Sequence, residues 1–164
     1  ALRCYLGVDQ VIAPDLPVRP DSAIAALEDL LQRFPIRGLI GSSLGGFYAT
    51  WLNRTRPLPT VLINPVVRPH EKLEAHTGQH RRWCDELPFD VDIGYLETLR
   101  ALQRDALTTA ERYLVLLQTG DEVLDYREAE DFYRDKTLEI TPGGNHRFER
   151  FDEHLPMIAD WLES

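Results

Sequence analysis

The sequence predicts an α/β fold, in which a mostly parallel sheet is flanked by helices. Short apolar runs alternate with longer amphipathic runs, which is typical of strand–helix–strand units. The run at 113–117 is apolar at every position, as expected of a parallel strand buried on both faces. With 164 residues, 43% of them hydrophobic, the chain suits a single domain spanning 1–164.

Apolar runs bounded by Pro or Gly predict three strands in the first half of the chain, at 11–13, 38–40 and 60–63. Two helices are predicted between them, one at 22–34 and one that begins at 47–52 and ends near Pro57. In the first of these, Ile24, Leu27 and Leu31 recur at helical spacing, and Pro35 ends the helix. This order gives the alternation that a parallel sheet requires.

The second half of the chain begins with a different pattern. Residues 70–110 have few β-branched residues and a helical patch at 95–107, so we expect a helical, lid-like segment over one end of the sheet. The alternation then resumes with four elements, namely strands at 113–117 and 137–140 and helices at 126–133 and 151–162. The last helix is expected to turn four residues inward, Leu155, Ile158, Trp161 and Leu162.

Net charge and apolar run length exclude several classes of protein. Lys and Arg number 18 against 27 Asp and Glu, and the resulting charge of −9 argues against a nucleic-acid or membrane-surface binder. No stretch reaches the roughly 18 apolar residues of a membrane helix. Cys4 and Cys84 are too few for a disulfide scaffold. The start at Ala1 has neither an initiator Met nor the shape of a signal peptide. We therefore expect a cytoplasmic protein whose natural chain begins earlier.

The strongest chemical signal is a G-x-S-x-G pattern between a predicted strand and a predicted helix. Ser43 is its central residue, and Gly41 and Gly45 flank it. Side chains at either glycine are expected to collide with the tight turn, and the Leu44 N–H at the helix start is free for an oxyanion. Ser42 competes as nucleophile but has no Gly two residues before it. The alternative is a glycine-rich turn that only links a strand to a helix.

A serine nucleophile needs a base, and the base needs an acid to orient it. Asp121 follows Gly120 at the carboxyl end of the strongest strand, where the active sites of open α/β sheets gather. Asp125 is the alternative acid, although it can instead cap the next helix. Position in the loop favours Asp121.

The candidate base is His146, in a glycine-rich loop after the next strand and 25 residues beyond Asp121. Serine, acid and base then follow predicted strands in the order that this chemistry uses. His154 is less favoured because it lies on the final helix. The remaining histidines precede the acid and break the order, namely His70, His76 and His80.

A metal site is the alternative that the spacing of other residues suggests. His76, His80 and Cys84 are spaced four residues apart and would share one face of a helix. Arg81 and Arg82 lie among them, and their charge opposes a bound cation. The phosphate-binding glycine motifs of nucleotide sites are absent from the sequence. We expect neither a metal nor a cofactor.

With these residues in place the chain resembles the α/β-hydrolases, and among them the small bacterial esterases of the YqiA type. The matching stretches spread over most of the chain, at 13–17, 41–50, 64–69, 118–126 and 143–148. The resemblance implies hydrolysis of small carboxylic esters, and acyl thioesters as a possible extension, with Ser43 as nucleophile, His146 as base and Asp121 as orienting acid. It makes Asp121, not Asp125, the acid position of the family.

The chain departs from this family at its start. Members of that family open with a strand that ends in a His-Gly-Phe-like turn, whose backbone N–H is the second oxyanion donor. We expect this N-terminal strand to be missing from the numbered chain. Segment 70–110 is where the resemblance places the acyl pocket and lid. Two alternatives to a serine esterase stay open, an acyl-CoA thioesterase or acyltransferase with the same residues, and a non-catalytic binding protein with this fold.

Overall fold

The computed structural model describes residues 1–75, 77–81 and 88–164. It separates into two compact units. The first unit is made of three stretches, 1–15, 36–67 and 106–164. The second unit is made of 16–35 and 68–105.

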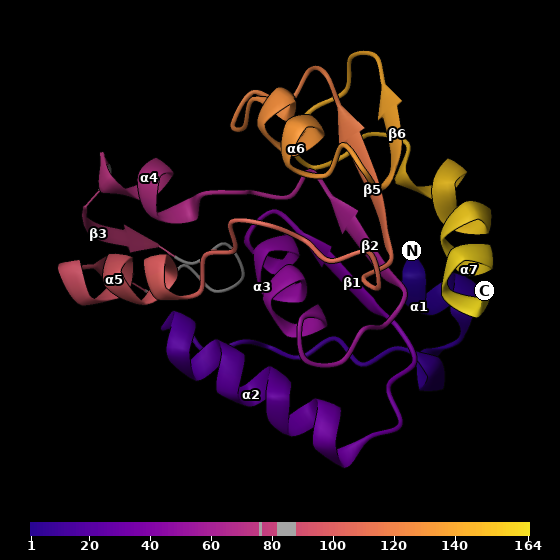
Figure 1. Cartoon of the computed structure of the whole chain (residues 1–164), viewed down its shortest axis with the longest axis horizontal. Helices are drawn as coiled ribbons and strands as arrows, with labels where there is room; N and C mark the ends of the chain where they lie inside the picture. The colour runs from indigo at the N-terminus through magenta and orange to yellow at the C-terminus, as the bar shows by residue number, and fades with distance from the viewer. Residues whose placement is uncertain (76, 82–87) are drawn as a thin grey trace. The chain divides into compact units, whose positions relative to one another are not determined.

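The first unit is built on a four-stranded parallel sheet with the strand order β1-β2-β5-β6 (Figure 1). Its strands are β1 (Leu39–Ser42), β2 (Thr60–Ile63), β5 (Tyr113–Gln118) and β6 (Thr137–Thr141). The register places Leu62 beside both Gly41 and Val115, so the strands end at one edge. The two central strands, β2 and β5, are buried along their whole length, as expected from their largely apolar sequences.

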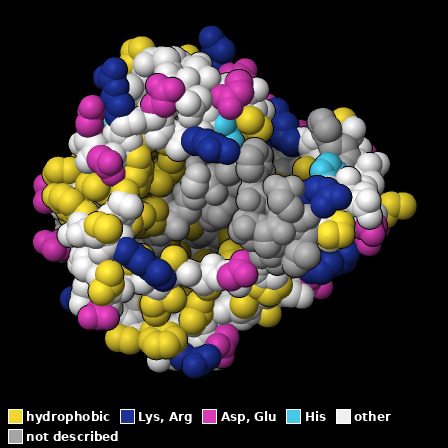
Figure 2. Space-filling model, turned by 180° about the vertical axis from the view of Figure 1, so that it is seen from behind, with side chains coloured by type: hydrophobic (Ala, Val, Ile, Leu, Met, Phe, Trp, Pro, Cys, Tyr) yellow, Lys and Arg dark blue, Asp and Glu magenta, His cyan; other side chains and the backbone are white. Residues whose placement is uncertain are grey.

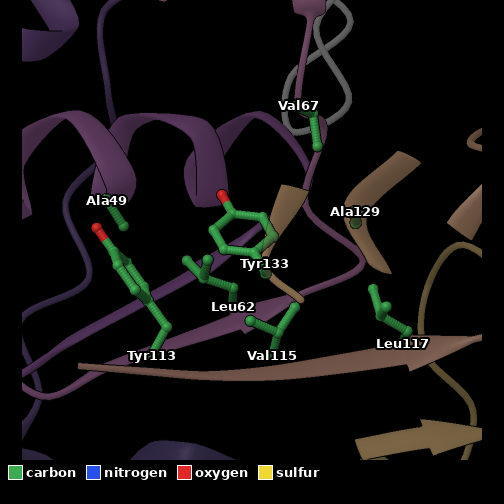
Figure 3. Packing of buried hydrophobic residues seen from close by; sticks show 8 residues of the cluster. All are labelled: Ala49, Leu62, Val67, Tyr113, Val115, Leu117, Ala129 and Tyr133. Carbon is green, nitrogen blue, oxygen red and sulfur yellow. The ribbon is translucent and has the colours of Figure 1, made fainter. Parts of the chain in front are cut away.

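Alternate residues of β5 point to opposite faces of the sheet, and all of them are buried. Both faces of the sheet are therefore covered by helices. On one face lie α3 (Leu44–Asn53) and α6 (Tyr126–Phe132), and on the other α7 (Leu155–Glu163) (Figure 1). Figure 3 shows the first of these cores, formed by Ala49, Leu62, Val67, Tyr113, Val115, Leu117, Ala129 and Tyr133. The second core contains Val61, Ile63, Leu114, Leu116, Phe148 and Ile158.

Short elements complete the first unit. The chain begins with α1 (Leu2–Leu6), which contacts α7, and a 3-10 turn η1 (Val8–Gln10) follows. A second 3-10 turn, η2 (Phe151–His154), precedes α7. Acidic and basic side chains are interspersed over the described part of the face shown in Figure 2.

The second unit combines helices with a pair of antiparallel strands. Its elements are α2 (Pro20–Arg33), α4 (Pro69–Glu74), β3 (Gly78–Arg81), β4 (Pro88–Val91) and α5 (Ile93–Ala101). Asp92 caps α5 by accepting the Tyr95 N–H at 2.7 Å, and it also binds the Arg19 guanidinium at 3.1 Å. These two contacts hold the pKa of the Asp92 carboxyl below its ordinary value, and they join the start of α2 to the start of α5.

Most predicted elements are present, and the fold class is confirmed. The strand predicted at 11–13 is wrong, because these residues have no ladder partner in the described chain and Pro14 lacks the N–H that pairing needs. The helix predicted from Phe47 to near Pro57 begins earlier, at Leu44, and ends at Asn53. The helix predicted at 95–107 lies at 93–101. No described helix is long and apolar enough to cross a membrane.

Two further elements differ from expectation. The closing helix predicted at 151–162 is divided into η2 and α7, because Pro156 lacks an N–H and starts a new helix. Its expected inward residues do face the core, with Leu155 and Ile158 buried and Trp161 and Leu162 packed at its margin. Segment 70–110 contains the β3–β4 pair as well as helices, and its role as a lid stays a prediction.

Candidate active site

Ser43 occupies a sharp turn between β1 and α3. Its backbone has φ 50° and ψ −119°, a conformation that non-glycine residues rarely adopt. Hydrogen bonds on both sides hold this conformation. The Ser43 N–H donates to the Ile63 carbonyl at 3.0 Å, and the Ser43 carbonyl accepts the N–H groups of Gly46 and Val66 at 3.0 and 3.3 Å. The turn is therefore held at the ends of β1 and β2 by hydrogen bonds between backbone atoms alone.

The glycines of this turn have different reasons for being glycine. A Cβ at Gly41 would lie 2.7 Å from the Gly46 nitrogen and closer still to the Gly45 carbonyl, so no side chain fits there. A Cβ at Gly46 would lie 2.8 Å from the Pro65 side chain. At Gly45 a Cβ would meet no described atom within 4 Å. The prediction that crowding demands glycine is right for Gly41 and wrong for Gly45, whose side-chain direction is open, and Gly46 is the second crowded position.

The Leu44 N–H is available at the start of α3. Leu44 is the first residue of the helix, so its N–H has no acceptor within the helix. The helix dipole adds a partial positive charge at this end. An anion that forms beside Ser43 can therefore be stabilised here, and the oxyanion role of Leu44 stays a prediction.

Asp121 lies three residues beyond the end of β5 with its side chain only 2% exposed. Its Oδ1 accepts the N–H groups of Val123 and Leu124, each at 2.9 Å. Its Oδ2 lies 2.8 Å from the Nδ1 of His146. These contacts fix the orientation of the side chain, with Oδ2 facing the imidazole. Asp125, the alternative acid, instead caps α6 by accepting the Arg127 N–H at 3.1 Å.

His146 links the acid to the serine. Its Nδ1 faces Asp121, and its Nε2 lies 3.1 Å from the Ser43 Oγ. The three side chains come from loops after β1, β5 and β6, which end at the same edge of the parallel sheet. The structure thus brings together the serine, histidine and aspartate that the sequence singles out, although 103 residues separate Ser43 from His146.

Three neighbouring residues were missed by the sequence analysis. Asn64 and Gln118 are both buried and both hydrogen-bond to the loop that carries His146. Glu122 accepts the His146 N–H at 3.0 Å, and this hydrogen bond is the main reason why the pKa of its carboxyl lies below the ordinary value. The available signal was position. Asn64 directly follows the apolar run 61–63 of β2, and Gln118 ends β5, which is otherwise apolar.

The structure describes three of the other four histidines. His154 lies in η2, where its ring contacts Phe148 edge to face. His80 lies in the strand β3, so the helical face that the metal hypothesis required does not exist at that residue. His76 and Cys84 lie outside the described residues. Within 1–75, 77–81 and 88–164, no group of three or more His, Cys, Asp or Glu side chains is arranged to hold a metal ion.

Comparison with known proteins places the chain in a family. The model of an uncharacterised protein family, UPF0227, matches residues 8–163. The chain belongs to the UPF0227 family. A UPF0227 protein of Shewanella sp. (strain ANA-3) is 26% identical over 121 residues, which are 73% of this chain and 62% of that protein. This UPF0227 chain therefore spans less than two thirds of the length of its curated relative.

Solved structures of hydrolases share the fold of this UPF0227 chain. A putative hydrolase from Agrobacterium vitis S4 superimposes with a TM-score of 0.67 at 19% identity, covering 88% of this chain and 69% of that one. The monoacylglycerol lipase of Paleococcus ferrophilus gives a TM-score of 0.64 at 14% identity, covering 87% and 74%. The predicted α/β-hydrolase fold is confirmed. At these identities the similarity concerns the fold alone.

Proposed function

We propose that this protein is a serine esterase that hydrolyses carboxylic esters through an acyl-enzyme. The observation that carries the proposal is the pair of contacts made by His146, 3.1 Å to the Ser43 hydroxyl and 2.8 Å to the Asp121 carboxylate. A carboxylate can only accept, so the Nδ1–H of His146 donates to Asp121. In the neutral imidazole, Nε2 is then the acceptor and is oriented to take the serine proton.

The proposed cycle uses only groups of the chain, the ester and water. The Ser43 Oγ attacks the ester carbonyl carbon while its proton passes to His146 Nε2, and Asp121 stabilises the imidazolium. The Leu44 N–H donates to the oxyanion. The imidazolium then protonates the leaving alcohol as the carbon–oxygen bond breaks. A water then attacks the acyl carbon while His146 takes its proton. The bond from that carbon to the Ser43 Oγ breaks as the imidazolium returns the proton to this oxygen, and the carboxylic acid leaves.

The names of the structural neighbours support the same class of substrate. One neighbour is a lipase and another a putative hydrolase, and both share the sheet whose strand ends carry Ser43, Asp121 and His146 here. The proposed substrate is accordingly a small molecule with an ester or thioester bond. No metal or cofactor takes part in the proposed cycle.

The test is hydrolysis of short p-nitrophenyl esters by purified Ser43→Ala and Ser42→Ala variants. Ser43→Ala is expected to abolish turnover and to keep the circular dichroism melt of the parent. Ser42→Ala, the neighbouring serine, is the matched control and is expected to stay active. Unimpaired turnover in Ser43→Ala excludes this serine as nucleophile.

Two further measurements separate the alternatives. A fluorophosphonate probe should label Ser43 in the parent, and a binding protein without catalysis would give no adduct. Comparing turnover of acyl-CoA with that of simple esters, with and without an acceptor alcohol, distinguishes a thioesterase or acyltransferase from an esterase.

A further inference from the structure

Asn64 is a buried polar residue at the end of an apolar strand. It follows β2 directly, it is 2% exposed, and its backbone has φ 40°. The left-handed region is unfavourable for most residues, and Asn is among those that tolerate it best. This conformation turns the chain out of β2 just beside the Ser43 turn, since the preceding residue, Ile63, accepts the Ser43 N–H.

The side chain of Asn64 joins two other segments. Its Oδ1 accepts the Gln118 N–H at the end of β5, at 3.0 Å. Its Nδ2 donates to the carbonyl oxygens of Asn145 and His146, at 3.0 and 3.3 Å. One amide therefore supplies an acceptor to β5 and donors to two consecutive peptide groups of the histidine loop. Few side chains combine acceptor and donor groups at this short length.

Gln118 holds the same loop from its other side. Its Oε1 accepts the N–H groups of Asn145 and Glu149 at 3.1 and 2.9 Å, and its Nε2 donates to the Glu149 carbonyl at 2.8 Å. Asn145 is thus held by its N–H through Gln118 and by its carbonyl through Asn64. Because Asn145 immediately precedes His146, these hydrogen bonds fix the backbone position from which the His146 side chain extends.

We infer that Asn64 is a positioning residue that sets the place of the His146 imidazole between Ser43 and Asp121. This inference rests on the proposed function, in which His146 is the base. Asn64 is the described side chain that bonds to the backbone carbonyl of His146 itself. A displacement of about 1 Å in a catalytic group costs on the order of 10²-fold in rate. Loss of the Nδ2 donor should therefore reduce kcat more than it affects substrate binding.

The principal variant is Asn64→Asp, which keeps the shape and the acceptor for the Gln118 N–H. It replaces the donor by an oxygen that faces two carbonyl oxygens, and these repel it. We expect kcat for p-nitrophenyl ester hydrolysis to fall about 10²-fold and KM to change by less than about twofold. The rate of fluorophosphonate labelling should fall with kcat, because the same base activates Ser43.

Asn53→Asp is the matched control. Asn53 is also fully buried in this unit, and its Oδ1 likewise accepts a backbone N–H, that of Leu58 at 2.6 Å. Its Nδ2 has no hydrogen-bond partner within the described structure. Asn53→Asp should lower the melting temperature and leave kcat at the parental value when assayed below the melt. Equal loss of kcat in both variants, or no loss in Asn64→Asp, overturns the inference.

Asn64→Gly keeps the test decisive if the aspartate variant does not fold. Glycine accepts φ 40° without strain, so this variant removes the side chain alone. A crystal structure of Asn64→Gly should place His146 Nε2 beyond about 3.5 Å from Ser43 Oγ, outside hydrogen-bonding distance. An unchanged separation of 3.1 Å contradicts the positioning role. This measurement needs no substrate, so it tests the positioning role independently of the esterase proposal. Failure of the esterase proposal would instead appear as a parent protein with neither turnover nor labelling.

Discussion

Gly120 and Gly143 are joined backbone to backbone, and this contact brings the loop of Asp121 against the loop of His146. The Gly120 N–H donates to the Gly143 carbonyl at 2.8 Å. A Cβ at Gly120 would lie 2.8 Å from the Gly143 carbonyl carbon and closer still to the Gly144 oxygen. The close approach of the Asp121 and His146 loops thus depends on Gly120, where no side chain fits.

A first prediction follows for Gly120→Ala. Overpacking of this kind costs about 1–3 kcal/mol, and here it should also separate the two loops, so both the melting temperature and kcat should fall. Gly94→Ala is the control, because a Cβ at Gly94 would make only ordinary contacts, the nearest 3.4 Å from Asp92. Thermal melts and ester turnover of both variants check this. Equal stability of the two would contradict the crowding seen at Gly120.

The two candidate acids can be separated by paired variants. Asp121→Asn should leave the fold intact and reduce kcat by about 10⁴-fold, because an amide favours the wrong imidazole tautomer. Asp125→Asn should keep full activity and stability, since Asn caps a helix about as well as Asp does. Turnover and melting of each variant are the measurements. A larger loss of activity in Asp125→Asn would reassign the acid.

The glycines of the serine turn should respond differently to a methyl group. Gly41→Ala pushes the new Cβ into the Gly45 carbonyl and should destabilise the protein by about 1–3 kcal/mol or prevent folding. In Gly45→Ala the new Cβ would meet no described atom within 4 Å. Position 45 lies within α3, where Ala is favoured over Gly by about 1 kcal/mol, so this variant should not be destabilised. Urea unfolding of both variants tests the difference. Comparable destabilisation would show that Gly45 is also crowded.

Acid stability should depend on Glu122. The His146 N–H, which the Glu122 carboxylate accepts, holds the pKa of this carboxyl below its ordinary value of 4.5. A depressed pKa contributes stability that is fully present above the unfolded value and is lost as the pH falls through the folded one. At neutral pH the parent should therefore melt at a higher temperature than Glu122→Gln. The two melting temperatures should converge as the pH falls below 4.5. A difference that stays constant with pH would rule out this contribution.

Local sequence patterns were enough to predict most of the sheet and the residues of the candidate site. The apolar run at 113–117 corresponds to β5, and the glycine pattern around Ser43 lies between β1 and α3. Both signals are short-range, because they depend on side-chain alternation and on turns that only small residues can make. The strand predicted at 11–13 failed because no pattern within three residues reveals whether a pairing partner exists.

By itself the sequence determined the four strands of the parallel sheet, the helices between them and the three residue types that follow the strand ends. Only the tertiary structure decided which aspartate reaches the imidazole, why Gly46 and not Gly45 is crowded, and that Asn64 holds the histidine loop 81 residues away. These features depend on how loops from separate strands pack together at one edge. Distances of that kind arise from the register of the sheet and from buried hydrogen bonds between distant segments, and no local pattern of residues encodes them.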